Sequence, residues 1–366
     1  MTWSLAAGPA VPLIAIGFVL AAVIALVATP IVRRVVRRQG LVDHPDERRT
    51  HRRPLPRGGG IAVVVAFVVV GGGLAALDGV IPGLPSARGV QANQLLGLFA
   101  GALLAAVIGV IDDALDLRAR WQLLGQVGVA LVAVAAGITV GHIGNPLGGS
   151  DILFPTWIGA AFTVVWIVGM INSLNFIDGL DGLSSGIALI AAVTLGILSL
   201  TAQVDQPFVA VLCFAFAGGL LGFLRWNFHP AVIFQGTAGM MFLGYTLGVL
   251  SILGTAKVIV AMLVLAVPII DSFWVIVRRL FSGRSPFSPD RGHIHHRLLD
   301  VGLSHRATVL LIYGMCATLG FMSLVVSGGT GLLAFLAAIV GFGVLVFLLG
   351  RRADGSMADG GEEARL

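Results

Sequence analysis

Charged residues are scarce in this sequence. Only 11% of its 366 residues are Asp, Glu, Lys or Arg, and lysine occurs once, at position 257, whereas soluble domains carry about 25% charged residues. Hydrophobic residues make up 57% of the chain, and its mean hydropathy is +0.98. This balance excludes an ordinary soluble domain and predicts a protein that is embedded in a lipid bilayer.

Cysteine is nearly absent as well. Cys213 and Cys316 are the only two, and both fall inside apolar runs without Cys-x-x-Cys spacing. This excludes a zinc site or a disulfide framework built on cysteine and predicts packing roles for both thiols. The net charge of +5 comes from arginines that lie in loops between apolar segments. That position is typical of membrane orientation, so we exclude nucleic acid as a partner.

The N-terminus lacks the basic segment that opens a signal peptide. Its apolar run from Val11 to Val32 is followed by four arginines instead, which predicts an uncleaved first span. Segments long enough to cross about 30 Å of hydrocarbon recur along the chain. Together they number eleven, at residues 9–32, 58–77, 94–111, 121–141, 152–171, 183–201, 207–224, 238–254, 257–277, 307–327 and 330–350. The predicted fold class is therefore all-α, a polytopic membrane bundle of about eleven helices.

The distribution of basic residues predicts the orientation of this bundle. With the N-terminus outside and the C-terminus cytoplasmic, the inner loops and tail hold 21 basic residues, against two in the outer loops. Basic residues favour the cytoplasmic side of short loops. We therefore expect a multi-pass protein of the cell membrane with one transmembrane domain, residues 1–350. Residues 351–366 are rich in Gly, Asp and Glu, which predicts a disordered cytoplasmic tail.

Two acidic clusters close predicted spans on the inner side. Asp112, Asp113 and Asp116 end the third span, and the run Asn172-x-x-Asn175-x-x-Asp178-x-x-Asp181 ends the fifth. Polar residues also simply end helices at an interface, and Asp-Gly pairs form turns. Neighbouring aspartates repel one another, however, unless they share a cation or a proton. The pattern favours Mg²⁺, with Mn²⁺ as an alternative, because hard cations take oxygen ligands.

A cluster of histidines follows the ninth predicted span. The loop contains Arg291, His293, His295 and His296, whose side chains suit the oxygens of phosphate. A zinc site is the alternative functional interpretation, but no cysteine is near and the His-Ile-His-His spacing does not match structural zinc sites. The arginines alone are equally well explained as positive-inside anchors. For the three histidines we favour an anion site.

The first inner loop ends in a glycine run, Pro-Leu-Pro-Arg-Gly-Gly-Gly at residues 54–60. Backbone N–H groups at the start of a helix bind phosphate, which makes a phosphate cradle one interpretation. Glycine is also common in membrane helices that pack closely, and the two interpretations have equal weight.

These motifs together resemble the polyprenyl-phosphate N-acetylhexosamine-1-phosphate transferases, the glycosyltransferase family that contains WecA and TagO and, more distantly, MraY. The similarity runs along the whole chain. It rests on the segment 54–59, the pair Asp112-Asp113, the run Asn172 to Leu183, the segment Asn227-Phe-His-Pro230, and the loop from Ser285 to His296. The run from Asn172 and the histidine loop are the most specific of these.

The resemblance implies a Mg²⁺-dependent transfer of a sugar phosphate from a UDP-sugar to polyprenyl phosphate, with release of UMP. The His-Ile-His-His form favours the WecA and TagO branch, hence UDP-N-acetylglucosamine as donor. A homodimer is compatible with this family, and the resemblance leaves both direct displacement and an aspartyl intermediate open. The resemblance also implies individual roles: Asp112, Asp113 and Asp178 as catalytic carboxylates; Asn175 as a magnesium ligand; and Asn172, Asp181, Phe234, Arg291, His293, His295 and His296 as substrate-binding residues, with Phe234 stacking on uracil.

One departure from the family is important. Where relatives usually read Gly-Asp-x-Gly-Ser, with the aspartate a magnesium ligand, this chain reads Gly236-Thr237-Ala-Gly-Met. Gln122, where many relatives have lysine, is a milder difference. Loss of a carboxylate should weaken Mg²⁺ binding unless Asp178 or Asp271 compensates. Two alternatives therefore stay open: a catalytically impaired homologue that binds lipid or nucleotide, and a membrane transporter, for which Asp271 inside the ninth span is the main support.

Overall fold

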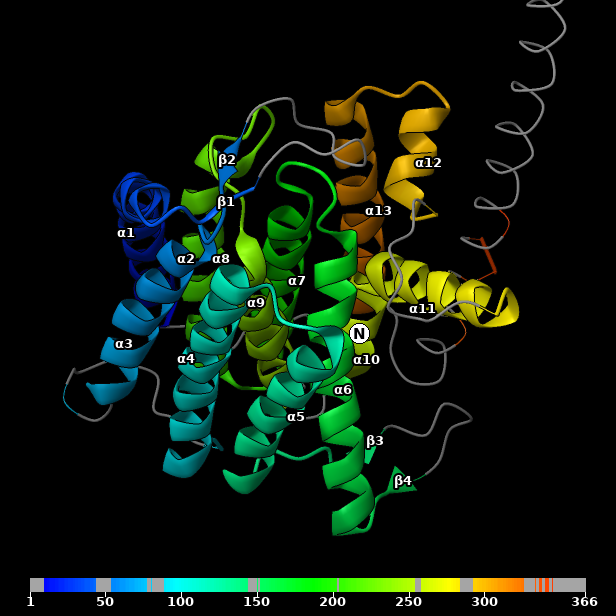
Figure 1. Ribbon diagram of the computed structural model, residues 1–366. Coiled ribbons are helices and arrows are strands. Elements are labelled where there is room, and N and C mark those ends of the chain that lie inside the picture. Colours follow the sequence, from blue (N-terminus) through cyan, green and yellow to red (C-terminus); the bar gives the residue numbers. More distant parts are fainter. Residues whose placement is uncertain are drawn as a thin grey trace, which may run out of the picture.

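The computed structural model describes residues 10–43, 54–77, 89–143, 152–202, 204–253, 258–283 and 292–325, with a few single residues beside these stretches. Helices dominate this part of the chain, as predicted, and its strands form two short antiparallel hairpins (Figure 1). The helices are α1 (Ala10–Arg38), α2 (Gly60–Phe67), α3 (Gly73–Ala76), α4 (Ala92–Leu115), α5 (Ala119–Ala135), α6 (Thr156–Ile177), α7 (Leu183–Ser199), α8 (Pro207–Asn227), α9 (Gly236–Leu250), α10 (Val258–Val264), α11 (Ala266–Phe281), α12 (Ile294–Asp300) and α13 (His305–Val325). A π-helical turn, η1 (Val68–Gly72), joins α2 to α3.

Each predicted apolar segment from 9–32 to 307–327 overlaps one or more helices, although residues 136–141 and 152–155 are not helical. Among the described residues, α1, α4, α6, α8 and α13 are long and apolar enough to span a membrane. Helices α10 and α11 form a sixth candidate, with a bend of 77° between them. Four further apolar helices are shorter: α2 to α3 taken together, α5, α7 and α9. The structure thus supports a multi-pass helical membrane protein with five or six candidate spans, and the predicted segment 330–350 lies almost entirely outside the described residues.

Local sequence explains how several of these helices begin. At the start of α4, the Gln91 backbone N–H donates to the side chain of Gln94 at 2.9 Å, one half of a capping box. Helix α8 has Pro207 at its first position, where the missing N–H is of no consequence.

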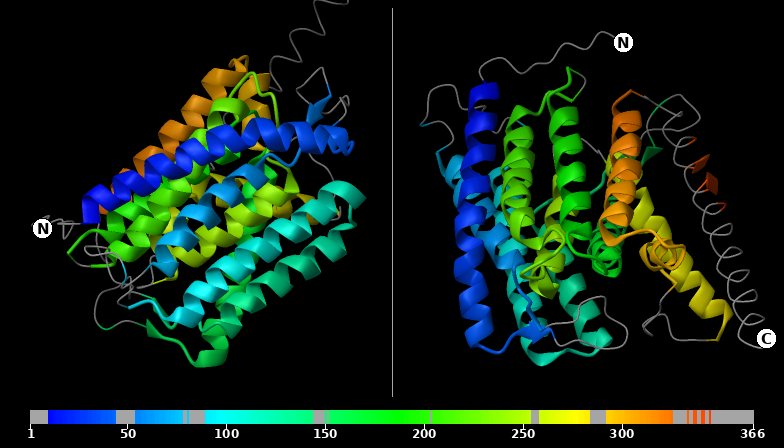
Figure 2. Two further views of the ribbon diagram at one scale, coloured as in Figure 1. Left: turned by 90° about the vertical axis from the view of Figure 1, so that its left-hand side faces the viewer. Right: turned by 90° about the horizontal axis from the view of Figure 1, so that it is seen from above.

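The centre of the bundle is formed by α7, α8 and α9, which are buried along most of their length. Helix α1 packs along α8, and α4 packs along α9. The outer helices α1, α4, α5 and α11 turn apolar side chains outward, among them Trp121, Phe273 and Phe281. Figure 2 shows α11 leaving the bundle at an angle, on the side away from α1. The outer faces of these helices are therefore apolar, like the interior of the bundle, as expected for helices in a lipid bilayer.

Several segments distant in sequence meet at one end of the bundle. The strands β1 (Val42–Asp43) and β2 (Leu55–Pro56) pair there, with Asp43 opposite Leu55. The backbone of Arg57, directly after β2, forms an isolated parallel β-bridge with that of Phe234. The α6–α7 turn and α12 lie at the same end (Figure 1). The second hairpin, β3 (His142–Ile143) with β4 (Ile152–Leu153), lies at the opposite end. The end that carries β1, β2 and α12 contains the predicted site residues.

Candidate functional site

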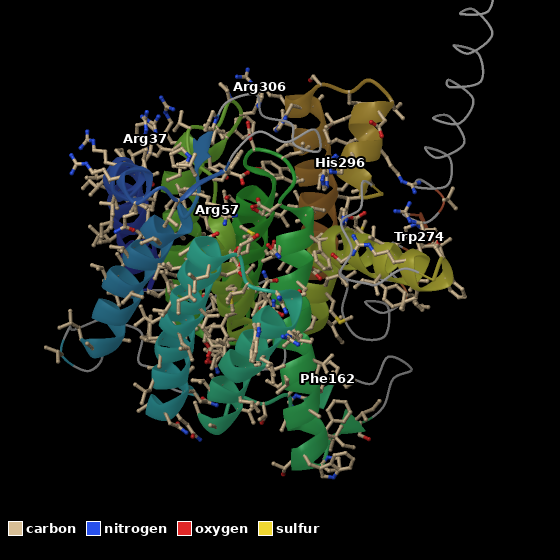
Figure 3. The ribbon with its side chains drawn as sticks, in the orientation of Figure 1. Arg37, Arg57, Phe162, Trp274, His296 and Arg306 are labelled. Carbon is tan, nitrogen blue, oxygen red and sulfur yellow. The ribbon has the colours of Figure 1, made fainter. Side chains whose placement is uncertain are left out.

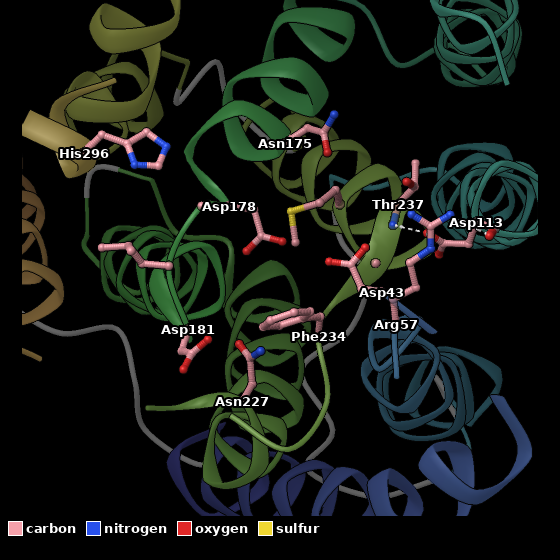
Figure 4. A pocket seen from close by; sticks show the side chains of 14 residues that line it. Asp43, Arg57, Asp113, Asn175, Asp178, Asp181, Asn227, Phe234, Thr237 and His296 are labelled. Atoms are coloured by element: carbon pink, nitrogen blue, oxygen red, sulfur yellow. Dashed lines mark hydrogen bonds and ion pairs between the residues drawn. The ribbon is translucent and has the colours of Figure 1, made fainter. Parts of the chain in front are cut away.

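Two cavities open at this end of the bundle and meet. The first has a volume of about 320 Å³, and Figure 4 shows its lining: Asp43, Arg57, Asp113, Asn175, Asp178, Gly179, Leu180, Asp181, Asn227, Phe234, Gly236, Thr237, Met240 and His296. The second, about 760 Å³, is a groove between α5, α6 and α11. Apolar side chains such as Leu123, Val164 and Val168 line this groove. The two share Asn175, Asp178, Gly179 and His296.

The turn between α6 and α7 supplies the junction. Helix α6 ends at Ile177, and Asp178 follows at once, so that its carboxylate faces the first cavity (Figure 4). The Ser184 hydroxyl donates a hydrogen bond to this carboxylate. The pKa of Asp178 is raised to about 7, mainly by burial and also by the negative charges of Asp181 and Asp113, and the hydrogen bond from Ser184 partly opposes this increase. A cation in the cavity would favour the ionised form of this carboxyl group and would compete with its proton.

Asp181 lines the same cavity but is already hydrogen-bonded. Its Oδ2 lies 2.7 Å from Nδ1 of His229 and accepts the Ala231 N–H at 3.1 Å. Its backbone N–H donates to Nε2 of His305, whose ring stacks on His229 at 4.1 Å. Three potential metal ligands therefore lie close together here. Because they hydrogen-bond to one another, we interpret them as a cluster that joins the α6–α7 turn to α13.

The adjacent aspartates at the end of α4 point in different directions. Asp113 is buried and accepts the N–H groups of Thr237 at 2.9 Å and Ala238 at 3.1 Å, so it caps the start of α9. Nε of Arg57 lies 3.6 Å from the same carboxylate. Asp112 instead accepts the side-chain N–H of Gln122 at 2.8 Å and the N–H of Leu117 at 3.1 Å. Asp113 lines the first cavity, whereas Asp112 lines neither cavity.

The glycine run opening α2 packs against the loop before α9. The N–H of Gly59 donates to the Phe234 carbonyl at 2.8 Å, and that of Gly60 donates to the Gln235 carbonyl at 2.9 Å. The interpretation of these N–H groups as a phosphate cradle is therefore wrong, because both are occupied. Gly236 has φ of +74°, and a Cβ there would lie 2.6 Å from the Asp113 carboxylate. The run and Gly236 instead let two chain segments approach closely enough to position Phe234 in the cavity.

The histidine segment lies beside both cavities. His293 Nδ1 lies 2.7 Å from Asp271, which also accepts the N–H of Ile294 at 2.8 Å. His295 is buried, and neither ring nitrogen has a hydrogen-bond partner among the described residues. Burial lowers its pKa well below the usual value, with the neighbouring histidines adding to the effect, so the ring is neutral. Unpartnered buried polar atoms are rare in folded proteins, and a bound ligand or water at His295 would satisfy these two.

The remaining predicted residues divide between the cavities. Asn172, His293 and His295 line the groove, and His296 lines both cavities. The Asn172 amide donates to the Gln126 side chain at 2.6 Å, which fixes its orientation toward the groove. Arg291 lies outside the described residues. Asp271 is partnered with His293 and Ile294 and lines neither cavity, so it is unsuited to compensate at the metal site and gives little support to a transport pathway.

Sequence reasoning missed Asp43. This residue reaches the first cavity from β1 and lies near Arg57 and Thr237 in Figure 4. Its signal in the sequence was an acidic residue just ahead of the arginine-rich first inner loop. Asn227 was quoted only as part of a motif, yet it also lines this cavity. Ser185 donates to its Oδ1 at 2.9 Å, and its own amide donates to the Ile233 carbonyl at 3.0 Å.

The donor groups of the first cavity fit a divalent cation. Four carboxylates line it, from Asp43, Asp113, Asp178 and Asp181, together with the amide oxygen of Asn175. Arg57 is the one arginine or lysine among the described lining residues. Among the described lining residues carboxylates outnumber guanidinium groups, and oxygen donors of this kind suit Mg²⁺. The cavity can bind a metal with phosphates, and the groove can bind an apolar chain.

Comparisons with known proteins show the family of this chain. The family described as glycosyl transferase family 4 matches residues 95–255. A "Probable undecaprenyl-phosphate N-acetylglucosaminyl 1-phosphate transferase" of Bacillus subtilis is 33% identical over 92% of this chain and 90% of its own length. A "Decaprenyl-phosphate N-acetylglucosaminephosphotransferase" of Mycolicibacterium smegmatis is 34% identical over 95% and 92%, respectively. An "Undecaprenyl-phosphate alpha-N-acetylglucosaminyl 1-phosphate transferase" of Escherichia coli is 28% identical over 76% and 75%. The chain belongs to glycosyl transferase family 4.

Proposed function

We propose that this protein is a membrane enzyme that transfers N-acetylglucosamine 1-phosphate from UDP-N-acetylglucosamine to a polyprenyl phosphate and releases UMP. The names of its relatives describe this class of reaction. A product of this kind, a sugar on a polyprenyl diphosphate, would begin the synthesis of a cell-wall or surface glycan. The proposal also requires a site in which a water-soluble nucleotide and a lipid meet.

The single observation that carries the proposal is the meeting of the two cavities at Asp178. One cavity is polar and rich in carboxylates, and the other is an apolar groove of about 760 Å³. A polyprenyl chain would lie along the groove, with its phosphate at the polar end near Gln122 and His295. A nucleotide diphosphate would occupy the first cavity. The acceptor phosphate would then lie next to the bond that breaks, which is the main requirement for phosphoryl transfer.

Several side chains suit the nucleotide. Phe234 lies in the first cavity (Figure 4). Its backbone N–H donates to the Pro56 carbonyl and its carbonyl accepts the Gly59 N–H, and its ring can stack on uracil. Asn227 is fixed by Ser185 and Ile233 and turns toward the same space. Arg57 and His296 supply donors for phosphate oxygens.

We assign the magnesium site to Asn175, Asp178 and Asp43, with the Thr237 hydroxyl as a neutral neighbour. Mn²⁺ has similar ligand preferences and could take its place. When bound, the cation would neutralise and orient the diphosphate of the donor. Asp43 is the structure's candidate for the carboxylate that Thr237 lacks, because it lines the same cavity from another segment.

The chemistry itself needs little from the protein beyond positioning. A phosphate monoester loses its second proton with a pKa near 6, so the acceptor needs no strong base. One of its oxygens forms a bond to the sugar-linked phosphorus, and the bond from that phosphorus to the bridging oxygen breaks, with the electron pair leaving on UMP. We propose direct displacement, because Asp113 is held by α9 and Asp112 lines neither cavity. Asp112 then acts by orienting Gln122 at the groove.

The arginine distribution supports placing both cavities on the cytoplasmic side of the cell membrane, with the N-terminus outside and the tail inside. UDP-sugars are cytoplasmic, which agrees with this placement. A homodimer stays a prediction from the family resemblance.

The test uses purified protein with undecaprenyl phosphate, labelled UDP-N-acetylglucosamine and Mg²⁺. We expect a labelled lipid and an equal amount of UMP, and loss of both in Asp178→Asn. Absence of lipid product and of UMP across a wide range of Mg²⁺ and Mn²⁺ concentrations would overturn the proposal. It would favour the second candidate, a catalytically impaired homologue that binds lipid or nucleotide, which Thr237 motivates.

A further inference from the structure

A third groove lies between α1 and the end of α8 and shares no lining residue with the two catalytic cavities. Its volume is about 400 Å³, and it is lined by Thr29, Pro30, Arg33, Arg34, Arg37 and Trp226. Three of these residues are arginines and none is acidic. Figure 3 places Arg37 at the same end of the bundle as Arg57 and His296, on the α1 side. Nothing in the proposed reaction uses this groove.

The floor of the groove is built by an interruption in α1. Pro30 has no N–H, so the Leu26 carbonyl lacks its usual helical donor. The indole N–H of Trp226 takes this place and donates to the Leu26 carbonyl at 3.0 Å. The helices are in close contact nearby, because a Cβ at Gly222 would lie 2.1 Å from the Ala22 carbonyl oxygen. The groove is therefore a fixed feature of two packed helices.

The positive charge of the groove has no protein counter-charge within the described residues. Arg33, Arg34 and Arg37 form no ion pair there, and Nε of Arg33 is buried without a hydrogen-bond partner. A fourth cation is close, since the Arg225 guanidinium lies 5.4 Å from the centre of a ring of Trp226. Like charges gathered around a buried, unpartnered donor indicate a bound anion.

The surface of α1 indicates where that anion comes from. A stripe of exposed apolar side chains runs along the helix at intervals of four residues, comprising Val19, Val23, Val27, Ile31 and Val35. This stripe faces hydrocarbon when α1 spans the bilayer, and it ends beside the arginines. The groove therefore lies at the depth of lipid headgroups, where acyl chains can follow the stripe and a phosphate can enter the groove.

We propose that this groove binds the phosphate of an anionic phospholipid of the surrounding bilayer. Guanidinium groups bind phosphate oxygens through paired hydrogen bonds, which a phosphodiester headgroup can accept. Positive-inside anchoring alone would explain exposed arginines, but it does not require a groove, an indole that closes its floor, or a buried unpartnered Nε. The proposal is independent of the catalytic activity.

The test uses full-length protein, delipidated in detergent, with thermal stability and native mass spectrometry as readouts. Phosphatidylglycerol or cardiolipin should stabilise the wild type and remain bound, whereas phosphatidylcholine should not. The double variant Arg33→Gln/Arg37→Gln should bind these anionic lipids at least about tenfold more weakly, because it loses charge-assisted hydrogen bonds. Arg38→Gln is the matched control, since Arg38 ends the same helix outside the groove. If the double variant does not fold, Arg37→Lys retains the charge and should weaken binding to a smaller extent.

Three outcomes would overturn the proposal. Equal lipid responses in the groove variants and in Arg38→Gln would show that only general surface charge matters. Equal stabilisation by inorganic phosphate or glycerol phosphate would indicate a free-anion site. Stabilisation by undecaprenyl phosphate alone, lost in the groove variants, would make the groove a second site for the acceptor lipid.

Discussion

Thr237→Asp introduces the carboxylate that the family resemblance implies at this position, and the structure predicts its effect. Thr237 lines the first cavity, and its backbone N–H donates to Oδ1 of Asp113 at 2.9 Å. An aspartate here would place a second carboxylate beside that of Asp113, within the space assigned to Mg²⁺. The substitution should therefore have opposite effects without and with the cation.

The magnitude follows from the separation of the two charges. Carboxylates roughly 5 Å apart repel by about 3 kcal/mol at an effective dielectric constant of about 20. Without a divalent cation, Thr237→Asp should lower the free energy of unfolding by up to about this amount. With Mg²⁺ the repulsion is replaced by attraction, and a gain of about 10- to 100-fold in apparent Mg²⁺ affinity is expected from a change of this kind at a metal site.

The assay is thermal unfolding of the purified protein, first in EDTA and then over a Mg²⁺ titration. Thr237→Asn is the matched control, because it has the size of aspartate without the charge. We expect Thr237→Asp to unfold at a lower temperature than Thr237→Asn in EDTA and to be stabilised at lower Mg²⁺ concentration. Turnover should follow the same order at limiting Mg²⁺.

Two results would refute this reasoning. Equal stability of the two variants in EDTA would mean that the residue at position 237 does not face Asp113 closely. Equal Mg²⁺ titrations would mean that the cation binds elsewhere, or that the existing ligands already saturate the site.

Further predictions concern the other parts of the site. Asp43→Asn should raise the Mg²⁺ concentration for half-maximal turnover about tenfold. The control Asp116→Asn, at an exposed position outside the cavity, should not change it. Equal Mg²⁺ titrations of the two variants would exclude Asp43 from the metal site. Gly169 lines the groove with open space beside it, so Gly169→Phe should raise KM for polyprenyl phosphate but not for the UDP-sugar. The control Gly128→Phe, on the exposed surface of α5, should leave both KM values unchanged. Parallel changes in both KM values would contradict a lipid groove. Because the pKa of Asp178 is raised to about 7, the folded protein retains a proton that the unfolded chain loses near pH 4, so metal-free stability should fall as pH rises from about 4 to 7. The Mg²⁺ demand of turnover should rise as pH falls below about 7; a flat demand between pH 6 and 8 would exclude this titration.

The helices could be predicted from sequence because a bilayer requires long apolar runs, and these are visible without tertiary information. The division of those runs into full spans and shorter helices could not. The segment 257–277 is apolar apart from Lys257, Asp271 and Ser272 and was predicted as one span, yet the chain bends by 77° between α10 and α11. The bend sends α11 along one side of the groove. Pro268, in the first turn of α11, marks where a break can occur, but it does not specify the angle or the direction of α11.

The site was predictable at the level of motifs and less so at the level of single atoms. Asn175 lies in the last turn of α6, and Asp178 and Asp181 follow in the next turn of the chain, so their proximity was encoded locally. Asp112 and Asp113 differ by about 100° around α4, and which of them faces the cavity depends on the start of α9. Asp43 could not be placed, because its position depends on the pairing of β1 with β2 across the intervening loop.

The substitution at Thr237 is compatible with the fold because Asp113, not the residue at 237, caps α9. Both N–H groups at the start of that helix are satisfied by Asp113, and Arg57 lies beside the same carboxylate. With a neutral residue at 237 the N–H groups of Thr237 and Ala238 remain paired, and the crowding of negative charge is reduced. The cost falls on cation binding alone, where Asp43 and Asp178 remain as carboxylates of the same cavity. If these two suffice, the enzyme differs from its relatives in how much Mg²⁺ it needs, and not in the reaction that it catalyses.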